Sequence, residues 1–236
     1  VATSSVRKGE TLLDTAMTIN AMQPDFLVVR HQSSGAAELL AQKVSCAVIN
    51  AGDGGHQHPT QTLTDLLTIR RYKGTLDNQT IAFCGDLKFG RTVHSLISAM
   101  SRYKGSKFVL VSPAELRLPE HLKSSLLEKY EVGIYETENL EEVINQVEVL
   151  YMTRIQKERF FNEADYMRLK DSYILSRSKL KDSREDMLVM HPLPRVNEIS
   201  YDVDDDKRAV YFKQAEFGIY VRMALMALLL GVDVNV

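Results

Sequence analysis

Short runs of apolar residues alternate with longer amphipathic segments along the first part of the chain. Residues 26–29 and 44–50 are β-branched and apolar enough to form buried strands. Residues 35–43, which lie between them, have the spacing of a short helix, and residues 11–22 have a similar spacing. A strand, a helix and a second strand in this order predict a βαβ unit, whose strands are parallel.

The same alternation starts again after a helix expected at residues 59–73 and a break at Gly74. Apolar runs predict a second set of strands, and segments of helical periodicity separate most of them. Strands are expected at residues 80–84, 107–111, 132–135, 147–152, 173–175 and 187–190, and helices at residues 92–103, 119–130, 140–146 and 214–230.

This pattern predicts the α/β class, with two parallel-sheet α/β domains bridged by helices. We expect residues 1–58 in the first domain, 59–73 as the bridging helix, 74–210 as the second domain and 211–236 as a C-terminal helix that packs back on the first domain. Ligands of open parallel sheets bind at the carboxyl ends of the strands. Polar residues that directly follow a strand are therefore the first candidates for a site.

Composition narrows the class of protein. The chain is 44% hydrophobic and 25% charged with a formal net charge of −2, which is ordinary for a soluble globular protein and gives no support to nucleic-acid binding. The two cysteines, Cys46 and Cys84, lie in apolar runs without metal-ligand spacing, which favours free thiols in a reducing compartment. No apolar stretch approaches the length of a membrane span, and no signal peptide is recognised. We therefore expect a cytoplasmic protein that binds neither nucleic acid nor a membrane.

The turn before the helix at residues 59–73 is the first candidate site. Its three glycines let the backbone approach a ligand closely, and Pro59 suits the first turn of a helix, whose N-terminus favours an anion. His58 and Gln61 are three residues apart and share one helix face. An imidazole can polarise a carbonyl, and an amide can both donate and accept. The turn predicts a site for a small polar or anionic ligand; a helix-capping turn with a structural histidine is the alternative.

Arginines follow four of the predicted strands. Guanidinium groups bind carboxylate and phosphate oxygens in bidentate fashion, so the set predicts one phosphate plus a dicarboxylate, or two multiply charged anions. A surface role is the alternative for each arginine. Residues 85–90 lack the spacing of a dinucleotide fingerprint, which leaves a nicotinamide dehydrogenase as the weaker alternative. The four arginines are Arg30, Arg91, Arg154 and Arg195.

Residues 191–194 form a stiff His-Pro-Leu-Pro segment directly after a predicted strand. An X-Pro bond there is a candidate for the cis isomer, which would direct a backbone carbonyl into the site. The acidic residues at 202–206 favour a solvated surface over a cation site. The remaining histidines have no spacing for a metal or a catalytic triad, so we expect no metal and a structural role for His31, His56, His94 and His121.

Four motifs, in their order along the chain, resemble those of the aspartate carbamoyltransferase family. The resemblance extends over residues 4–230. They are His58-Pro59-Thr60-Gln61, Gly85-Asp86-Leu87-Lys88-Phe89-Gly90-Arg91-Thr92-Val93-His94-Ser95, Tyr151-Met152-Thr153-Arg154-Ile155-Gln156-Lys157-Glu158-Arg159 and His191-Pro192-Leu193-Pro194-Arg195.

The resemblance implies a carbamoyl-phosphate domain, an aspartate domain and a homotrimer with active sites shared between neighbours. Regulatory chains are further partners that the family allows. The implied reaction transfers the carbamoyl group of carbamoyl phosphate to L-aspartate in pyrimidine synthesis, and it needs no cofactor.

The resemblance also implies roles for single residues. Arg30 and His58 would hold the carbonyl oxygen of carbamoyl phosphate as the catalytic pair, and Arg30 would also touch the phosphate. Gln61 and the backbone carbonyls around Leu193 and Pro194 would bind the amino group of the same substrate. Donors aimed at the carbonyl oxygen would stabilise the oxyanion of a tetrahedral intermediate.

The second substrate would be held by other residues. Arg91 and Arg154 would clamp the two carboxylates of aspartate, with Gln156 beside them. Ser4 and Lys8 resemble loop residues that reach into the neighbouring subunit's site, Ser4 toward carbamoyl phosphate and Lys8 toward aspartate.

The chain also departs from the family. The phosphate-binding motif Ser-Thr-Arg-Thr-Arg is expected upstream of Ser4 and is absent from this sequence. We therefore expect an incomplete carbamoyl-phosphate domain and no activity from the 236 residues alone, with an inactive truncated relative as the alternative. Ornithine carbamoyltransferase is another alternative. It has His-Cys-Leu-Pro in place of residues 191–194 and binds a cationic side chain, which Arg154 and Arg195 would repel.

Overall fold

The computed structural model describes residues 9–155, 162, 164, 167, 169, 171 and 173–232. The chain divides into two compact units, Val1–Thr60 with Arg222–Val236, and Gln61–Val221. Each unit has its own parallel sheet, so the predicted fold of two parallel-sheet α/β domains is confirmed. The boundaries between the units lie inside two helices, Pro59–Lys73 and Tyr211–Leu229.

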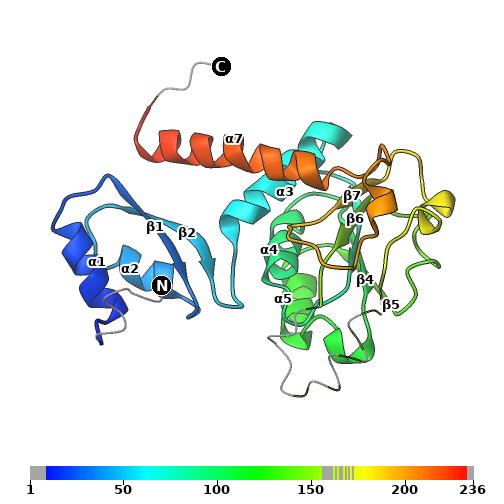
Figure 1. Ribbon diagram of the computed structural model, residues 1–236, viewed down its shortest axis with the longest axis horizontal. Helices are drawn as coiled ribbons and strands as arrows, with labels where there is room; N and C mark the ends of the chain where they lie inside the picture. Colours follow the sequence, from blue (N-terminus) through cyan, green and yellow to red (C-terminus); the bar gives the residue numbers. More distant parts are fainter. Residues whose placement is uncertain are drawn as a thin grey trace. The chain divides into compact units, whose positions relative to one another are not determined.

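The first unit is a βαβ arrangement. Strand β1 (Phe26–His31) pairs in parallel with strand β2 (Ala47–Asp53), and helix α2 (Ala36–Ala41) connects them (Figure 1). Helix α1 (Leu12–Asn20) begins after Thr11, whose hydroxyl oxygen accepts from the backbone N–H of Asp14 at 3.1 Å while the Asp14 carboxylate accepts from the Thr11 N–H at 3.3 Å. This reciprocal cap supplies partners for N–H groups that a helix start otherwise leaves unpaired.

The second unit contains a five-stranded sheet in which every pairing is parallel. The strand order is β5-β4-β3-β6-β7, so the chain runs outward from β3 to one edge and then returns to β6 on the other side. The point where the direction reverses lies between β3 and β6. The strands are β3 (Thr80–Cys84), β4 (Lys107–Val111), β5 (Gly133–Thr137), β6 (Val149–Met152) and β7 (Leu188–Met190).

Helices cover one face of this sheet. Ile81 and Phe83 of β3 point to that face and pack in one cluster with Ile69, Leu96 and Leu126, one from each of three helices. Full burial of such a side chain contributes about 1.5–3 kcal/mol, so these contacts supply much of the stability of the unit. The helices of this face are α3 (Pro59–Lys73), α4 (Arg91–Met100) and α5 (Glu120–Lys129). The unit also contains α7 (Tyr211–Leu229) and short 3₁₀ turns at Ala114–Leu116, Lys179–Asp182 and Tyr201–Val203.

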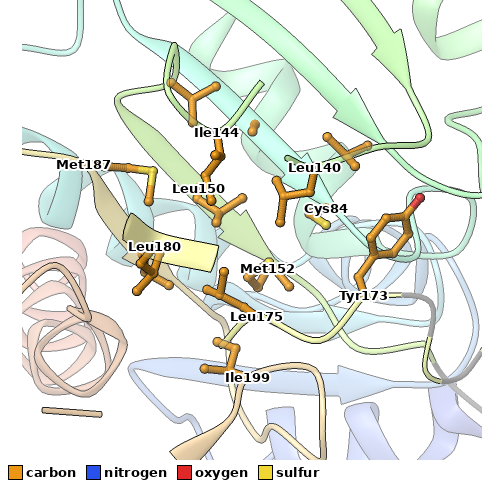
Figure 2. Packing of buried hydrophobic residues seen from close by; sticks show 14 of the residues in the cluster. Cys84, Leu140, Ile144, Leu150, Met152, Tyr173, Leu175, Leu180, Met187 and Ile199 are labelled. Carbon is orange, nitrogen blue, oxygen red and sulfur yellow. The ribbon is translucent and has the colours of Figure 1, made fainter. Parts of the chain in front are cut away.

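Irregular segments cover the other face of the sheet. Ala82 and Cys84 point to this face, where residues of the segments around 140–147 and 173–187 complete a second buried cluster. Figure 2 shows Leu140, Ile144 and Leu175 gathered around Leu150 and Met152 of β6. Both faces of the sheet are therefore buried, as parallel strands require.

Two predicted elements on this second face are wrong. Residues 140–146 form successive turns and not a helix, in which the N–H groups of Val143 and Gln146 bond carbonyls three residues back, those of Leu140 and Val143, and no continuous helical ladder forms. Residues 173–175 form only an isolated bridge, Leu175 with Ile199, and not a strand. In both segments the apolar side chains are buried against the sheet, although the backbone does not form the regular hydrogen bonds of a helix or a strand.

Other predicted elements are confirmed, and the bounds of β3, β4 and α3 agree with the expected ranges. Helix α3 begins at Pro59, which fits the first helical turn, and ends before Gly74, whose φ is +74°.

Within the described ranges, no helix has the length and apolarity needed to cross a membrane. Both cysteines are free, with Cys84 buried and Cys46 half-buried.

Candidate functional site

The carboxyl edge of the first sheet holds two of the predicted site residues. Arg30 is the fifth residue of β1 and is exposed, and His58 follows β2 just before α3 and is half-buried. Since β1 and β2 are parallel neighbours, with Val29 opposite Asn50, both residues belong to the same edge of this sheet. The Nδ1 atom of His58 lies 3.4 Å from the Thr60 hydroxyl oxygen.

A buried carboxylate shapes the turn that precedes His58. Asp53 accepts hydrogen bonds from the N–H groups of Gly35 at 2.8 Å and Gln57 at 2.9 Å, and it also contacts His56 Nδ1 at 3.0 Å. Burial raises the pKa of Asp53, but the hydrogen bond from Gly35 and those from its other partners outweigh burial and lower the pKa to about 2. The turn is thus fixed by an ionised side chain at neutral pH.

In the second unit, two loops meet where the strand order reverses. The N–H of Asp86 donates to the Thr153 hydroxyl at 3.0 Å, and the N–H of Thr153 donates to the Cys84 carbonyl at 2.9 Å. A Cβ atom at Gly85, where φ is +121°, would lie 2.4 Å from the Thr153 carbonyl oxygen. Only glycine permits this close approach of the two strand ends.

Arg91 and Arg154 follow these two strand ends. Arg91 is the first residue of α4, which comes after β3, and Arg154 lies two residues beyond β6. Both are half-buried. The carboxyl ends of strands at a reversal of strand order are where open α/β sheets bind ligands, so the sheet order places Arg91 and Arg154 after the two strands that flank this position.

The segment after β7 is a closed loop built around His191. Its Nε2 atom lies 2.7 Å from Glu198, and its Nδ1 atom accepts from the Leu193 N–H at 2.8 Å. These contacts assign the ring proton to Nε2, which donates to the carboxylate. Glu198 also accepts from the N–H groups of Val196 and Asn197. Leu193 has φ +53° and a cis peptide bond to Pro194, which confirms the isomer expected for this segment.

A second buried carboxylate, Asp65 of α3, joins several elements of this unit. Its Oδ1 atom accepts from Gln61 Nε2 at 2.8 Å and from Gln214 Nε2 at 2.6 Å, and its Oδ2 atom accepts from the Tyr151 hydroxyl at 2.9 Å. Gln214 also accepts from the His191 N–H at 3.0 Å. We call Gln61, Asp65, Tyr151 and Gln214 the Asp65 cluster. It connects α3, the strand that leads to Arg154, α7 and the loop that contains Leu193.

Burial dominates the protonation of Asp65. The side chain is fully buried, and this raises its pKa to about 7 even though the hydrogen bonds from Gln61, Gln214 and Tyr151 lower it. Burial and the neighbouring Asp65 raise the pKa of Tyr151, so its hydroxyl remains a donor. If Asp65 carried a proton on Oδ2, only the hydrogen bond with Tyr151 would change its direction, because both glutamines donate to Oδ1.

The structure differs from the expectations for some of the predicted residues, and others fall outside it. Ser4, Lys8 and Gln156 lie outside the described residues. Arg195 is not available for an anionic ligand: its guanidinium pairs with Asp204 and contacts the rings of Tyr201 and Tyr211, which corrects the expectation based on its position after a strand.

The acidic residues at 202–206 are also more than a solvated surface, because Asp204 and Asp206 accept from Arg195 and Arg208. His94 has the expected structural role, since its Nε2 contacts the Leu87 carbonyl at 2.8 Å. The described residues include no group of three His, Cys, Asp or Glu side chains arranged to hold a metal ion.

The Asp65 cluster was not predicted from the sequence. The one local signal was the position of Asp65 four residues after Gln61, which places both on one helix face. Its other partners are 86 and 149 residues away in the sequence, a separation that no local pattern indicates.

Comparison with known proteins gives a consistent result. The family model of the aspartate/ornithine carbamoyltransferase carbamoyl-P binding domain matches residues 1–71, and the model of the Asp/Orn binding domain of the same family matches residues 77–229. A similar curated protein, the aspartate carbamoyltransferase catalytic subunit of Clostridium botulinum, is 61% identical over 229 residues, which are 97% of this chain and 74% of that protein. The catalytic subunit of Clostridium perfringens is 60% identical over 228 residues, with the same coverage.

Solved structures agree with the sequence comparison. Aspartate transcarbamoylase from Trypanosoma cruzi in complex with N-(phosphonacetyl)-L-aspartic acid matches with a TM-score of 0.89 at 40% identity, covering 96% of this chain and 72% of that one. The catalytic subunit of the M. jannaschii enzyme matches with a TM-score of 0.88 at 48% identity, covering 98% and 74%. The chain thus spans about three quarters of the length of these relatives.

Asp65 gives a testable dependence of stability on pH. Its pKa is about 7 in the folded protein, against 3.8 for the unperturbed group. Between these values the folded state holds a proton that the unfolded state has lost, so the free energy of unfolding falls as the pH rises. We predict that the titration of Asp65 lowers the free energy of unfolding by about 4 kcal/mol between about pH 4 and about pH 7.

The variant Asp65→Asn has no ionisable group at this position. It should therefore lack the decrease in the free energy of unfolding that Asp65 causes between about pH 4 and about pH 7. Chemical denaturation of both proteins at a series of pH values measures the difference in the free energy of unfolding. If the two curves run parallel across this interval, Asp65 does not titrate as its burial requires.

Proposed function

The chain belongs to the aspartate carbamoyltransferase family, and we propose that the residues at the two sheet edges perform the family's reaction. The carbamoyl group of carbamoyl phosphate is transferred to the amino group of L-aspartate, giving N-carbamoyl-L-aspartate and phosphate, a step of pyrimidine synthesis. The observation that carries the proposal is the match of both family domains, in order, together with 61% identity to a catalytic subunit. A T. cruzi relative has been crystallised with carbamoyl phosphate and aspartate together.

Carbamoyl phosphate is activated by donors at its carbonyl oxygen. Arg30 and His58, which share the edge of the first sheet, donate to that oxygen, and Arg30 also contacts the phosphate. The amino nitrogen of aspartate attacks the carbonyl carbon, and the negative charge that develops on the oxygen is stabilised by the two donors. The C–O bond to phosphate then breaks, the attacking nitrogen loses a proton, and phosphate leaves.

The amino group of carbamoyl phosphate needs acceptors. Gln61 at the start of α3 and the backbone carbonyls of Leu193 and Pro194 supply them. The closed loop around His191 supports this role, because the hydrogen bond between Leu193 N–H and His191 Nδ1 defines the backbone conformation there.

Aspartate is bound by Arg91 and Arg154. Their positions at the reversal point between β3 and β6 favour a dicarboxylate, since each guanidinium group can form a bidentate pair with one carboxylate. Gln156 assists them. Arg154 disfavours ornithine, whose side chain carries an ammonium group. Arg195 takes no part in this discrimination, because Asp204 already neutralises it.

The assembly and location are also part of the proposal. Family membership supports a homotrimer in which Ser4 and Lys8 reach a neighbouring active site, and regulatory chains are further partners that the family allows. The free thiols of Cys46 and Cys84 support a reducing compartment and hence the cytoplasm.

Replacing His58 tests the activation of the carbonyl group. His58→Ala should lower kcat of the full-length protein by about 10²-fold or more, because it removes one donor to the developing oxyanion. Steady-state production of N-carbamoyl-L-aspartate measures this. His121→Ala, at an exposed position of α5, is the matched control and should leave kcat unchanged. A raised KM with unchanged kcat in His58→Ala would make His58 a binding residue only.

Replacing Arg154 tests the clamp on aspartate. Arg154→Ala should raise KM for aspartate by about 10- to 100-fold, the effect of losing one charge-assisted pair, and should change KM for carbamoyl phosphate far less. Arg117→Ala is the control, since Arg117 forms an exposed ion pair with Glu138. Equal losses for the two substrates would contradict the assignment of Arg154 to aspartate.

A further inference from the structure

The hydrogen bond between Gln61 and Asp65 determines which end of the Gln61 amide is available for a ligand. An ionised carboxylate only accepts hydrogen bonds, so the amide atom 2.8 Å from Asp65 Oδ1 is the nitrogen, Nε2. The amide oxygen Oε1 therefore faces away from Asp65. Gln61 is half-buried in the first turn of α3 and presents an acceptor, not a donor, at the helix start.

The same carboxylate oxygen also holds the loop after β7. Gln214 Nε2 donates to Asp65 Oδ1 at 2.6 Å, and Gln214 Oε1 accepts from the His191 N–H at 3.0 Å. His191 in turn accepts from the Leu193 N–H. One continuous chain of hydrogen bonds thus runs from Gln61 through Asp65 and Gln214 to the backbone of Leu193.

The middle of this chain is protected from solvent, whereas Gln61 and Leu193 at its two ends are half-buried. Asp65 is fully buried, Gln214 is 1% exposed and His191 is 2% exposed. Hydrogen bonds at low dielectric constant hold their partners more strongly than those in water, and leaving one unpaired is costly. The orientation of Gln61 and the conformation of the loop are therefore coupled through a carboxylate that itself lies one helical turn inside α3.

We propose that Asp65 is a positioning residue for the recognition of the carbamoyl amino group. It holds the Gln61 amide and the loop of Leu193 and Pro194 so that only oxygen acceptors face that group. This inference rests on the proposed function and deepens it, because it adds the residue that makes the recognition selective for an amino group.

The selectivity has a direct chemical consequence. Acetyl phosphate has the same phosphate and carbonyl as carbamoyl phosphate, but a methyl group replaces the amino group. A methyl group cannot donate to Gln61 Oε1 or to the carbonyls of Leu193 and Pro194, and it leaves them unpaired. Sites built to pair a substrate N–H reject analogues that lack it. If Gln61 were free to rotate, its Nε2 group would accommodate both substrates more equally.

The test compares kcat/KM for carbamoyl phosphate with kcat/KM for acetyl phosphate in the full-length protein, with aspartate as the acceptor. Asp65→Leu keeps the approximate shape of the side chain but removes both acceptors. The ratio of the two values should fall by about tenfold or more, the effect of one lost hydrogen bond to the amino group. A purely structural role for Asp65 would lower both rates together and leave the ratio unchanged.

Two further variants separate positioning from stability. Asp65→Asn keeps an oxygen that accepts from Gln61 and Gln214, and its amide nitrogen can donate to Tyr151, so the ratio should remain within about threefold of the native value. Tyr151→Phe is the matched control. It removes the bond to the other carboxylate oxygen, so it should lower stability but leave the ratio unchanged.

The outcomes are distinct. If the native protein converts neither substrate with aspartate, the proposed function is wrong. If it prefers carbamoyl phosphate but Asp65→Leu keeps the native ratio, the positioning role is wrong and the function stands. If Asp65→Leu does not fold, Gln61→Leu decides: the ratio must fall by about tenfold or more there too, and an unchanged ratio overturns the proposal.

Discussion

The hydrogen bonds that Asp65 accepts inside the second unit are the interaction on which the arrangement of the site depends. Burial of a lone carboxylate is costly, and the three donors Gln61, Gln214 and Tyr151 offset that cost, since hydrogen bonds to charged groups contribute about 1.5–3 kcal/mol each. The raised pKa, about 7, indicates that the offset is incomplete. An apolar residue at this position would avoid the cost of burial but would leave both glutamine amides without their acceptor.

The order of strands explains why the contributing residues meet at all. The chain builds β3, β4 and β5 toward one edge and then returns to place β6 and β7 on the other side of β3. All strands are parallel, so their carboxyl ends share one edge, where the loops after β3, β6 and β7 lie. Gly85 allows the first two of these loops to touch. The Asp65 cluster then connects α3 to the ends of β6 and β7.

Sequence patterns predict the part of this structure that depends on local periodicity. The bounds of α3 and the placement of His58 and Gln61 at its start follow from a strand, a glycine-rich turn and a proline. The strands β3 and β4 follow from uninterrupted apolar runs. The segment at residues 140–146 shows the limit of this approach, because Leu140, Val143 and Ile144 are spaced as in a helix but cover the sheet from successive turns.

Interactions between residues distant in the sequence were not predicted, for physical reasons. Arg195 follows a strand as Arg91 and Arg154 do, but Asp204 and the aromatic rings of Tyr201 and Tyr211 hold its guanidinium. No local spacing indicates that pairing. The role of Asp65 is hidden in the same way, because a single aspartate in an amphipathic helix is usually solvated. Only tertiary packing brings Tyr151 and Gln214 to it.

An experimental structure of the full-length protein with carbamoyl phosphate bound, determined well above the pKa of Asp65, tests the central claim most directly. At that pH the carboxylate can only accept, so the Gln61 atom that touches Asp65 is its nitrogen. The account predicts that this contact persists and that Gln61 Oε1 lies about 3 Å from the carbamoyl nitrogen, with the carbonyls of Leu193 and Pro194 on the same group. A structure in which Gln61 leaves Asp65 to reach the substrate, or in which other residues bind the amino group, would contradict it.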